Sequence, residues 1–164
     1  MYNDESAKLN PFSGFLITFI VAMRNIHFFF QSPLPTLRKR TALKAFLIKQ
    51  SRRLGRPIHT LNIIFCSDPY LISINQQFLQ HNDYTDIITF DLSNSSSEPL
   101  HAEIYISIDR VRDNAKQLAV SFKQELHRVI FHGTLHLMGY KDKKKSDIAL
   151  MRSMEDRLLT AYFT

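Results

Sequence analysis

The chain has 164 residues, of which 45% are hydrophobic, so it can form one domain with a core of its own and does not have the composition of a disordered protein. Lys and Arg outnumber Asp and Glu by 21 to 15, and the resulting formal net charge of +6 is compatible with a polyanionic partner such as nucleic acid. The single cysteine, Cys66, cannot form an internal disulfide, and its apolar neighbours indicate a buried thiol in a reducing compartment.

The N-terminal part contains the most apolar stretch of the chain, GFLITFIVAM at residues 14–23. These ten residues are too few to cross a bilayer as a helix. The preceding MYNDESAK carries two acidic residues against one basic residue, unlike the basic start of a secretory signal. We therefore expect neither a membrane span nor a targeting signal, and we treat residues 1–22 as an N-terminal extension or the product of a misassigned start.

The remaining sequence has the patterns of alternating strands and helices. Alternating or continuous apolar runs predict strands at about residues 26–30, 61–66, 86–92 and 103–108. Helical spacing of apolar residues and terminal signals predict helices at about residues 37–54, 68–78, 109–119, 121–138 and 146–162. The Ser/Asn-rich loop at residues 93–97 predicts an antiparallel pair, whereas the two earlier helical crossovers predict parallel neighbours. The chain is thus expected to fold as a single α+β domain with a small mixed β-sheet of about four strands packed with about five helices.

The helix predicted at residues 121–138 carries the residues with chemical interest. Ser121 and Gln124 form a capping-box pattern, and Gly139 is a typical terminator. His132 and His136 are four residues apart, which places both imidazoles on one helix face, one turn apart. This spacing suits a single metal ion in a zincin-like site, and zinc is the usual ion for paired imidazoles. Two histidines that only form hydrogen bonds within a helix are the alternative.

Asp142 is the predicted third ligand. Because Gly139 ends the helix, the next residues can fold back and bring the Asp142 carboxylate toward the histidines. A catalytic zinc typically has three protein ligands and one position left for water, and the two histidines with Asp142 match that count. A helix cap, or an ion pair with a neighbouring lysine, is the alternative role for Asp142.

At this point the sequence resembles a known family. Residues 132–140 read HGTLHLMGY, and they resemble the YbeY-family signature H-G-x-L-H-L-x-G-Y at every defined position. Residues 85–90, TDIITF, and residues 103–107, EIYIS, are similar to two further segments of that family. The likeness extends from about Asn25 to the C-terminus, with the elements in the same order.

The resemblance implies an endoribonuclease that depends on zinc and is specific for single-stranded RNA, with residues 23–164 as its catalytic domain. It also implies maturation of the 3′ end of small-subunit rRNA, ribosome quality control and a cytoplasmic location. One Zn²⁺ per chain, held by His132, His136 and Asp142, is the expected cofactor, and these three residues are the expected catalytic residues. The expected partners are rRNA and the ribosome or its small subunit, without a membrane; the sequence indicates no oligomeric state.

The sequence departs from the family pattern within the site. Asp142 occupies the position where the family usually has a third histidine. A carboxylate can bind the metal there, but it lowers the net charge of the centre, so bound water is expected to be less acidic than in a three-histidine site. Ala102 replaces a glycine of the family, and we expect this change to be harmless.

Leu79 occupies a position where many family members carry an arginine that is thought to matter for activity. A nearby cation would have to replace it, and Lys141, Lys143 and Lys144 flank the proposed site. These lysines are expected to bind substrate phosphates or to stabilise charge on a transferring phosphoryl group. A solvated charged loop is the alternative.

A zinc peptidase is one competing reading of a helix with two histidines. In the peptidase motif H-E-x-x-H, the glutamate after the first histidine is the general base. Gly133 occupies that position here, so a peptidase is not favoured. Phosphodiester cleavage depends less on such a base. RNA also supplies its own nucleophile, the 2′-hydroxyl, so the sequence leaves open whether metal-bound water attacks the phosphate or only assists.

The second competing reading is a ribosome assembly factor that binds metal without catalysis. A purely structural zinc site usually has four protein ligands, often cysteines. Cys66 lies far from the histidines in the sequence, which argues mildly against this reading. Metal binding without RNA cleavage would favour it.

Overall fold

The computed structural model describes residues 25–33, 37–79 and 85–164, with the side chain of Leu79 outside that description. The apolar stretch at residues 14–23, and with it the expected extension 1–22, lies outside the described residues. None of the helices within the described ranges combines the length and the apolar composition that crossing a bilayer requires.

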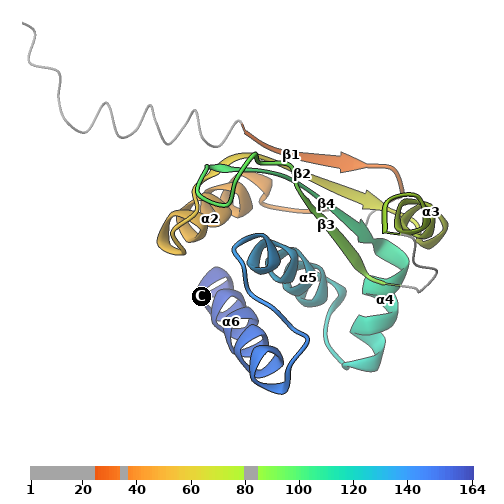
Figure 1. Ribbon diagram of the computed structural model, residues 1–164. Helices are drawn as coiled ribbons and strands as arrows, with labels where there is room; N and C mark the ends of the chain where they lie inside the picture. Colours follow the sequence, from red (N-terminus) through yellow and green to blue (C-terminus); the bar gives the residue numbers. More distant parts are fainter. Residues whose placement is uncertain (1–24, 34–36, 80–84) are drawn as a thin grey trace, which may run out of the picture.

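The strands and helices follow one another in the predicted order (Figure 1). The strands are β1 (Ile26–Phe30), β2 (Ile58–Cys66), β3 (Ile87–Asp91) and β4 (Leu100–Ser107). The helices are α2 (Arg40–Arg53), α3 (Asp68–Leu79), α4 (Ile108–Gln117), α5 (Phe122–Leu137) and α6 (Lys145–Phe163). The described residues therefore confirm the predicted single α+β domain, with one mixed sheet of four strands and five helices.

The strand order of the sheet is β1-β2-β4-β3. β1, β2 and β4 run parallel, whereas β3 pairs antiparallel with β4, as the loop at residues 93–97 predicts. The second helical crossover joins β2 to β3 through α3, and the prediction that these two strands are parallel neighbours is wrong. β4 rather than β3 lies beside β2. Ile104 and Ile106 of β4 are fully buried, so this strand belongs in the centre, while the shorter β3 ends at the exposed Asp91 and lies at the edge.

Two hydrophobic clusters cover the two faces of the sheet. The main core lies between one face and helices α2, α5 and α6 (Figure 1). The smaller cluster lies on the other face under α3 and consists of Cys66, Leu71, Ile74 and Ile88, which confirms that Cys66 is a buried thiol. The two clusters together explain why β2 has a nearly continuous apolar sequence.

α5 is the central helix, in contact with β3 and β4 on one side and with α4 and α6 on others. Gly133 allows the close approach to the sheet, because a Cβ at this position would lie 2.4 Å from Cδ1 of Ile87 and 3.3 Å from two side-chain atoms of Ile104. The helix begins as predicted, with Ser121 Oγ accepting a hydrogen bond from the Gln124 amide at 3.1 Å. The sheet contact therefore sets the depth at which this helix lies in the core.

Candidate metal centre

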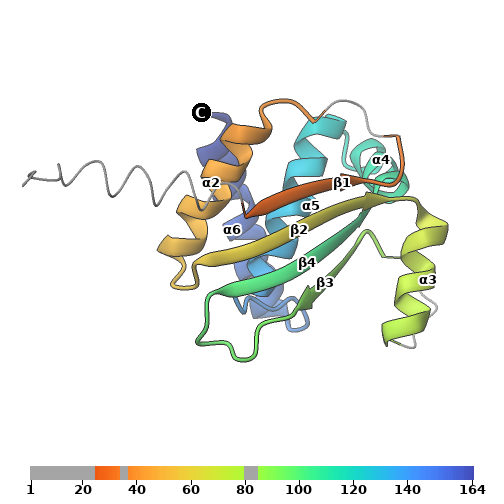
Figure 2. The ribbon, with the colours of Figure 1, turned by 90° about the horizontal axis from the view of Figure 1, so that it is seen from above.

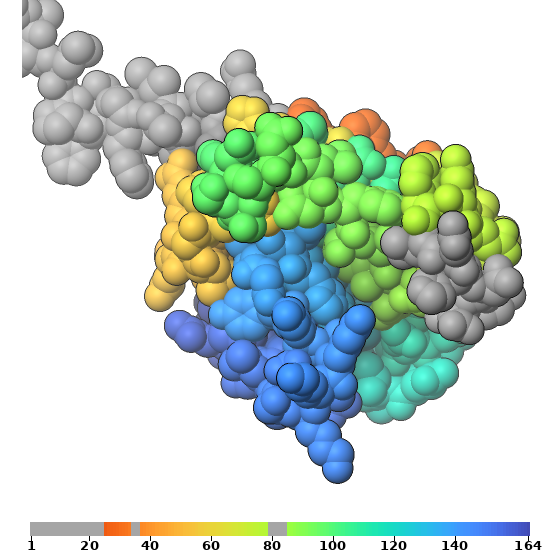
Figure 3. All heavy atoms as spheres, in the orientation of Figure 1, coloured from red at the N-terminus to blue at the C-terminus, as the bar shows by residue number. Residues whose placement is uncertain are grey.

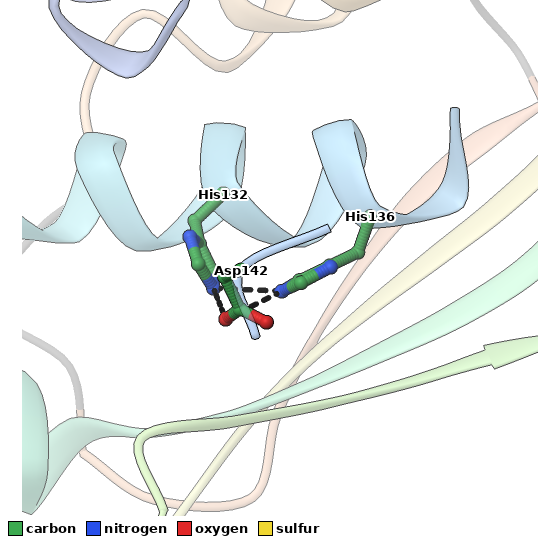
Figure 4. A group of neighbouring side chains, drawn as sticks. All are labelled: His132, His136 and Asp142. Atoms are coloured by element: carbon green, nitrogen blue, oxygen red, sulfur yellow. Dashed lines mark hydrogen bonds and ion pairs between the residues drawn. The ribbon is translucent and has the colours of Figure 1, made fainter. Parts of the chain in front are cut away.

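His132 and His136 project from the same face of α5, one turn apart. Their Nε2 atoms lie 2.9 Å apart and their ring planes are nearly perpendicular, at 89°. Figure 4 shows both rings directed toward the same point beside the helix. The structure thus brings the two predicted ligands together in the arrangement that the spacing predicts.

Asp142 reaches the same point from the segment after the helix. Gly139 has a positive φ of 91°, and the Tyr140 amide donates a hydrogen bond back to the Leu135 carbonyl at 3.1 Å. This reversal is the turn that the glycine predicts. It places Asp142 Oδ2 3.3 Å from His136 Nε2 and 3.7 Å from His132 Nε2 (Figure 4).

The donor chemistry of this group fits a cation. The carbonyl of Tyr140 can only accept, so His136 Nδ1, 3.0 Å away, must carry the proton. Nδ1 of His132 likewise faces a carboxylate oxygen, Oε1 of Glu155, at 2.6 Å. Neutral rings with protonated Nδ1 atoms leave both Nε2 atoms with lone pairs, and these converge with Asp142 Oδ2 within 4.8 Å of one another. Such a group is favourable only with a proton or a cation between its members, and His₂Asp is a ligand set that suits zinc.

Glu155 is a residue of this centre that the analysis of the sequence missed. It lies on α6, is only 6% exposed and also accepts a hydrogen bond from Arg128 Nη1 at 3.2 Å. A carboxylate that holds the outer nitrogen of a ligating histidine orients the ring and increases its basicity. A signal was present in the sequence, because Glu155 falls on the apolar stripe of α6 between Met151 and Leu158, where an acidic residue needs a partner.

Acidic side chains surround the partly buried His132 and determine the electrostatics of the centre. Burial alone would lower the pKa of His132, but the hydrogen bond and charge of Glu155, with the charges of Asp86 and Asp142, raise it above its ordinary value. Burial raises the pKa of Asp86, although the positive charge of His132 acts against this effect. Asp86 is a further acidic residue near the histidines, and its carboxylate accepts a hydrogen bond from Asn114 at 3.1 Å. The surroundings thus favour positive charge at the site.

Comparison with known proteins identifies the family. The model of the family described as "Endoribonuclease YbeY" matches residues 34–163. The chain belongs to the YbeY family. The recognition made from HGTLHLMGY and its companion segments is therefore confirmed.

Individual YbeY relatives cover most of the chain. The protein named endoribonuclease YbeY of Cytophaga hutchinsonii is 45% identical over 135 residues, which are 82% of this chain and 94% of that protein. The one of Porphyromonas gingivalis is 41% identical over 138 residues, 84% of this chain and 89% of that protein. The solution structure of TM1509 from Thermotoga maritima, 23% identical, superimposes with a TM-score of 0.56 over 84% of this chain and 89% of that one, which shows a shared fold.

The departures from the YbeY pattern have different outcomes in the structure. Asp142, in place of the usual third histidine, lies close to the other two candidate ligands, His132 and His136. Leu79 ends α3, but its side chain is outside the described residues, so its effect stays a prediction. Ala102 is fully buried in β4 within the main core, where its methyl group is accommodated.

Lys141, Lys143 and Lys144 lie exposed in the segment that carries Asp142. Within the described part of the chain, no hydrogen bond or ion pair holds their side chains. Figure 3 shows this segment, between α5 and α6, at the molecular surface. Their place beside the candidate centre is compatible with phosphate binding, which stays a prediction.

Proposed function

We propose that this chain is a zinc-dependent endoribonuclease that cleaves single-stranded RNA. The observation that carries the proposal is the convergence of His132 Nε2, His136 Nε2 and an Asp142 oxygen in a chain of the YbeY family. The relatives named endoribonuclease YbeY support RNA as the substrate. The net charge of +6 suits a polyanion.

Different residues of the chain are assigned to metal binding and to phosphate binding. Zinc, when bound, supplies Lewis-acid activation of water or of a phosphate oxygen. His132 and His136 would hold it through Nε2, together with Asp142, while Glu155 and the Tyr140 carbonyl keep the protons on the two Nδ1 atoms. We assign phosphate binding to Lys141, Lys143 and Lys144, whose exposed ammonium groups can move to meet the substrate backbone.

The structure adds an argument against a peptidase. In H-E-x-x-H enzymes the residue after the first histidine provides the base, but here Gly133 is buried against Ile87 and Ile104. A side chain at this position would point into the sheet. The assembly-factor reading is opposed by the ligand count, since three protein ligands leave a coordination position for chemistry.

The proposal includes a role in ribosome maturation. The substrate we infer is the precursor 3′ end of small-subunit rRNA, with the ribosome or its small subunit as partner, action in ribosome quality control, and the cytoplasm as the location. Co-sedimentation of the tagged chain with small subunits, and accumulation of 3′-extended rRNA when the chain is depleted from its own cell, would test this part.

The activity itself is tested with purified protein and labelled single-stranded RNA, with double-stranded RNA and single-stranded DNA as alternative substrates. The wild type is expected to cut the single-stranded RNA, while His136→Ala and Asp142→Ala lose both zinc and cleavage. His101→Ala is the matched control, because His101 is an exposed histidine of β4 outside the site, and it should keep both. Zinc bound without any RNA cleavage would replace this proposal by the assembly factor.

A further inference from the structure

One face of the sheet carries an exposed row of aromatic rings. Figure 2 looks down on this face, with the four strands in front, α3 covering one end, and α5 and α6 behind. Phe29, Ile64 and Tyr105 are direct neighbours across β1, β2 and β4. Phe29 is 47% exposed and Tyr105 is half-buried, so aromatic surface on this face is open to contact.

A hollow of about 370 Å³ lies on this row. Its lining has four aromatic residues, Phe29, Phe30, Tyr70 and Tyr105, and three polar residues, Gln31, Asn62 and Glu103. The Glu103 carboxylate accepts hydrogen bonds from Asn62 Nδ2 at 3.1 Å and from the Tyr105 hydroxyl at 2.7 Å. These bonds fix the carboxylate, and they leave it with free lone pairs, because a carboxylate has about four acceptor sites. The hollow thus combines flat apolar walls with a fixed acceptor.

A nucleobase with adjacent N–H donors matches this chemistry. The Watson–Crick edge of guanine presents an imino and an amino donor side by side, which a carboxylate can accept together. Adenine presents an acceptor nitrogen beside its amino group, and that nitrogen would face a carboxylate lone pair. Aromatic side chains on an open sheet are a known platform for the bases of single strands.

The aromatic row continues from the hollow to the edge strand β3 and to α3. The Tyr105 ring lies 5.8 Å from the Phe90 ring, and Phe90 lies 5.5 Å from Phe78, which is 57% exposed. Phe90 belongs to β3, the edge strand whose Ile87 contacts α5 next to His132. These rings lie on the α3 face of the sheet and the candidate metal centre lies on the α5 side, so a single strand that follows the rings reaches the centre by passing around the β3 edge.

Positive charge lies at the other end of the row. A second hollow, of about 320 Å³, shares Phe29 with the first and is also lined by Arg40 and Lys44. The Arg40 guanidinium lies 4.5 Å from the ring centre of Phe30, and Lys44 Nζ lies 5.6 Å from that of Phe28. Phe28 and Phe30 alternate with Phe29 along β1 and pack toward Phe65 of the main core, so these cations lie around the edge strand from the aromatic row. There they suit the phosphates of a strand that passes over the β1 edge.

We propose that this open face binds the single-stranded RNA substrate, with a guanine seated between Phe29 and Tyr105 against Glu103. The inference rests on the proposed ribonuclease function, for which it names a base-binding site away from the metal. It assigns Phe29 to stacking and Glu103 to recognition of the donor edge.

The test measures fluorescence anisotropy of labelled oligouridines that contain a single guanine or a single adenine, with the full chain, at one fixed salt concentration and immediately after mixing. Wild type should prefer the guanine oligomer by about tenfold. Phe29→Ala should weaken binding of the guanine oligomer by about tenfold. Glu103→Gln should remove the preference for guanine. Phe163→Ala, which removes a comparably exposed ring at the end of α6, is the matched control and should bind as wild type.

The readouts separate this inference from the proposed function. Zinc content and kcat should stay unchanged in Phe29→Ala, while KM rises; circular dichroism verifies that the variants are folded. If wild type binds RNA but cuts none, the ribonuclease proposal fails. The affinities of wild type and variants for the two oligomers still show whether the base-binding site exists. Equal affinities of Phe29→Ala, Phe163→Ala and wild type, no guanine preference in the wild type, or no binding of RNA by the wild type would overturn the inference, and the face would then be a candidate surface for a protein partner.

Discussion

Glu155 on α6 places its Oε1 atom 2.6 Å from Nδ1 of His132 on α5, so the last helix of the fold orients a candidate metal ligand on the central one. The same carboxylate accepts from Arg128, which also contacts Asp156 at 3.0 Å. The contact explains why a charged residue is buried on α6. It also makes the packing of α6 against α5 part of the candidate centre.

Replacing Glu155 should weaken metal binding without removing a ligand. Glu155→Gln keeps a hydrogen-bond acceptor but loses the negative charge, so we expect zinc affinity to fall by about 10- to 100-fold. Competition with a chromophoric chelator measures the affinity. Asp156→Asn is the matched control, because Asp156 shares Arg128 but does not touch His132. Equal zinc affinities of the two variants would show that Glu155 has only a structural role.

Replacing Asp142 by histidine should restore the three-histidine set usual in the YbeY family. The neutral imidazole raises the net charge of the centre, and a water molecule at a more positive centre ionises more readily. We therefore expect Asp142→His to keep zinc and to show its rise in cleavage rate at lower pH than the wild type. A pH–rate profile for each protein measures this difference. An unchanged profile, with zinc still bound, would speak against direct ligation by Asp142.

The close contact of Gly133 with the sheet predicts a coupling with Ile87. In Gly133→Ala the new methyl group lies 2.4 Å from Cδ1 of Ile87, a contact that forces the side chain to move. Ile87→Val removes that Cδ1 atom. The double variant should therefore be more stable than the sum of the single changes predicts, by about 1 kcal/mol. Urea unfolding of all four proteins measures the coupling, and additive changes would refute the close contact.

Arg56 links the end of α5 to the sheet and should contribute measurably to stability. Its guanidinium contacts both carboxylate oxygens of Asp91, at 2.5 and 3.2 Å, and donates to the Leu137 carbonyl at 3.0 Å. A lysine cannot make these contacts together, so Arg56→Lys should lower the free energy of unfolding by about 1–3 kcal/mol. Urea unfolding checks this value, and Arg53→Lys, an exposed change at the end of α2, is the control.

The contribution of Arg56 to the free energy of unfolding should depend on pH. Burial would raise the pKa of Asp91, but hydrogen bonds from Arg56 and Ser93 outweigh it and lower the pKa. Because the folded-state pKa is lowered, the stabilisation is fully present above the ordinary aspartate pKa of about 4 and is lost as the pH falls through the lower folded value. The stability difference between wild type and Arg56→Lys should therefore shrink in acid, and a difference that grows in acid would contradict this assignment.

The helix that carries the site was predictable because its signals are local. Ser121 and Gly139 mark its ends, and the spacing of His132 and His136 sets their common face. The turn at Gly139 also made the return of Asp142 predictable. These features depend on residues close together in the sequence.

The features that could not be predicted depend on contacts between distant elements. The place of β3 at the edge follows from competition between β3 and β4 for the centre of the sheet, which no local pattern encodes. The contact of Glu155 with His132 joins two helices, although the acidic residue on an apolar stripe was a usable signal. The short distance between Gly133 and Ile87 depends on how deep α5 lies in the core.

The most direct test of the account is RNA cleavage by the wild-type chain after removal of metal with a chelator and reconstitution with zinc. We expect the metal-free chain to lose cleavage of labelled single-stranded RNA and to regain it as zinc reaches about one equivalent per chain. The His136→Ala variant should regain none. Undiminished cleavage by the metal-free chain, or full zinc binding without recovery of cleavage, would contradict a catalytic metal centre at His132, His136 and Asp142.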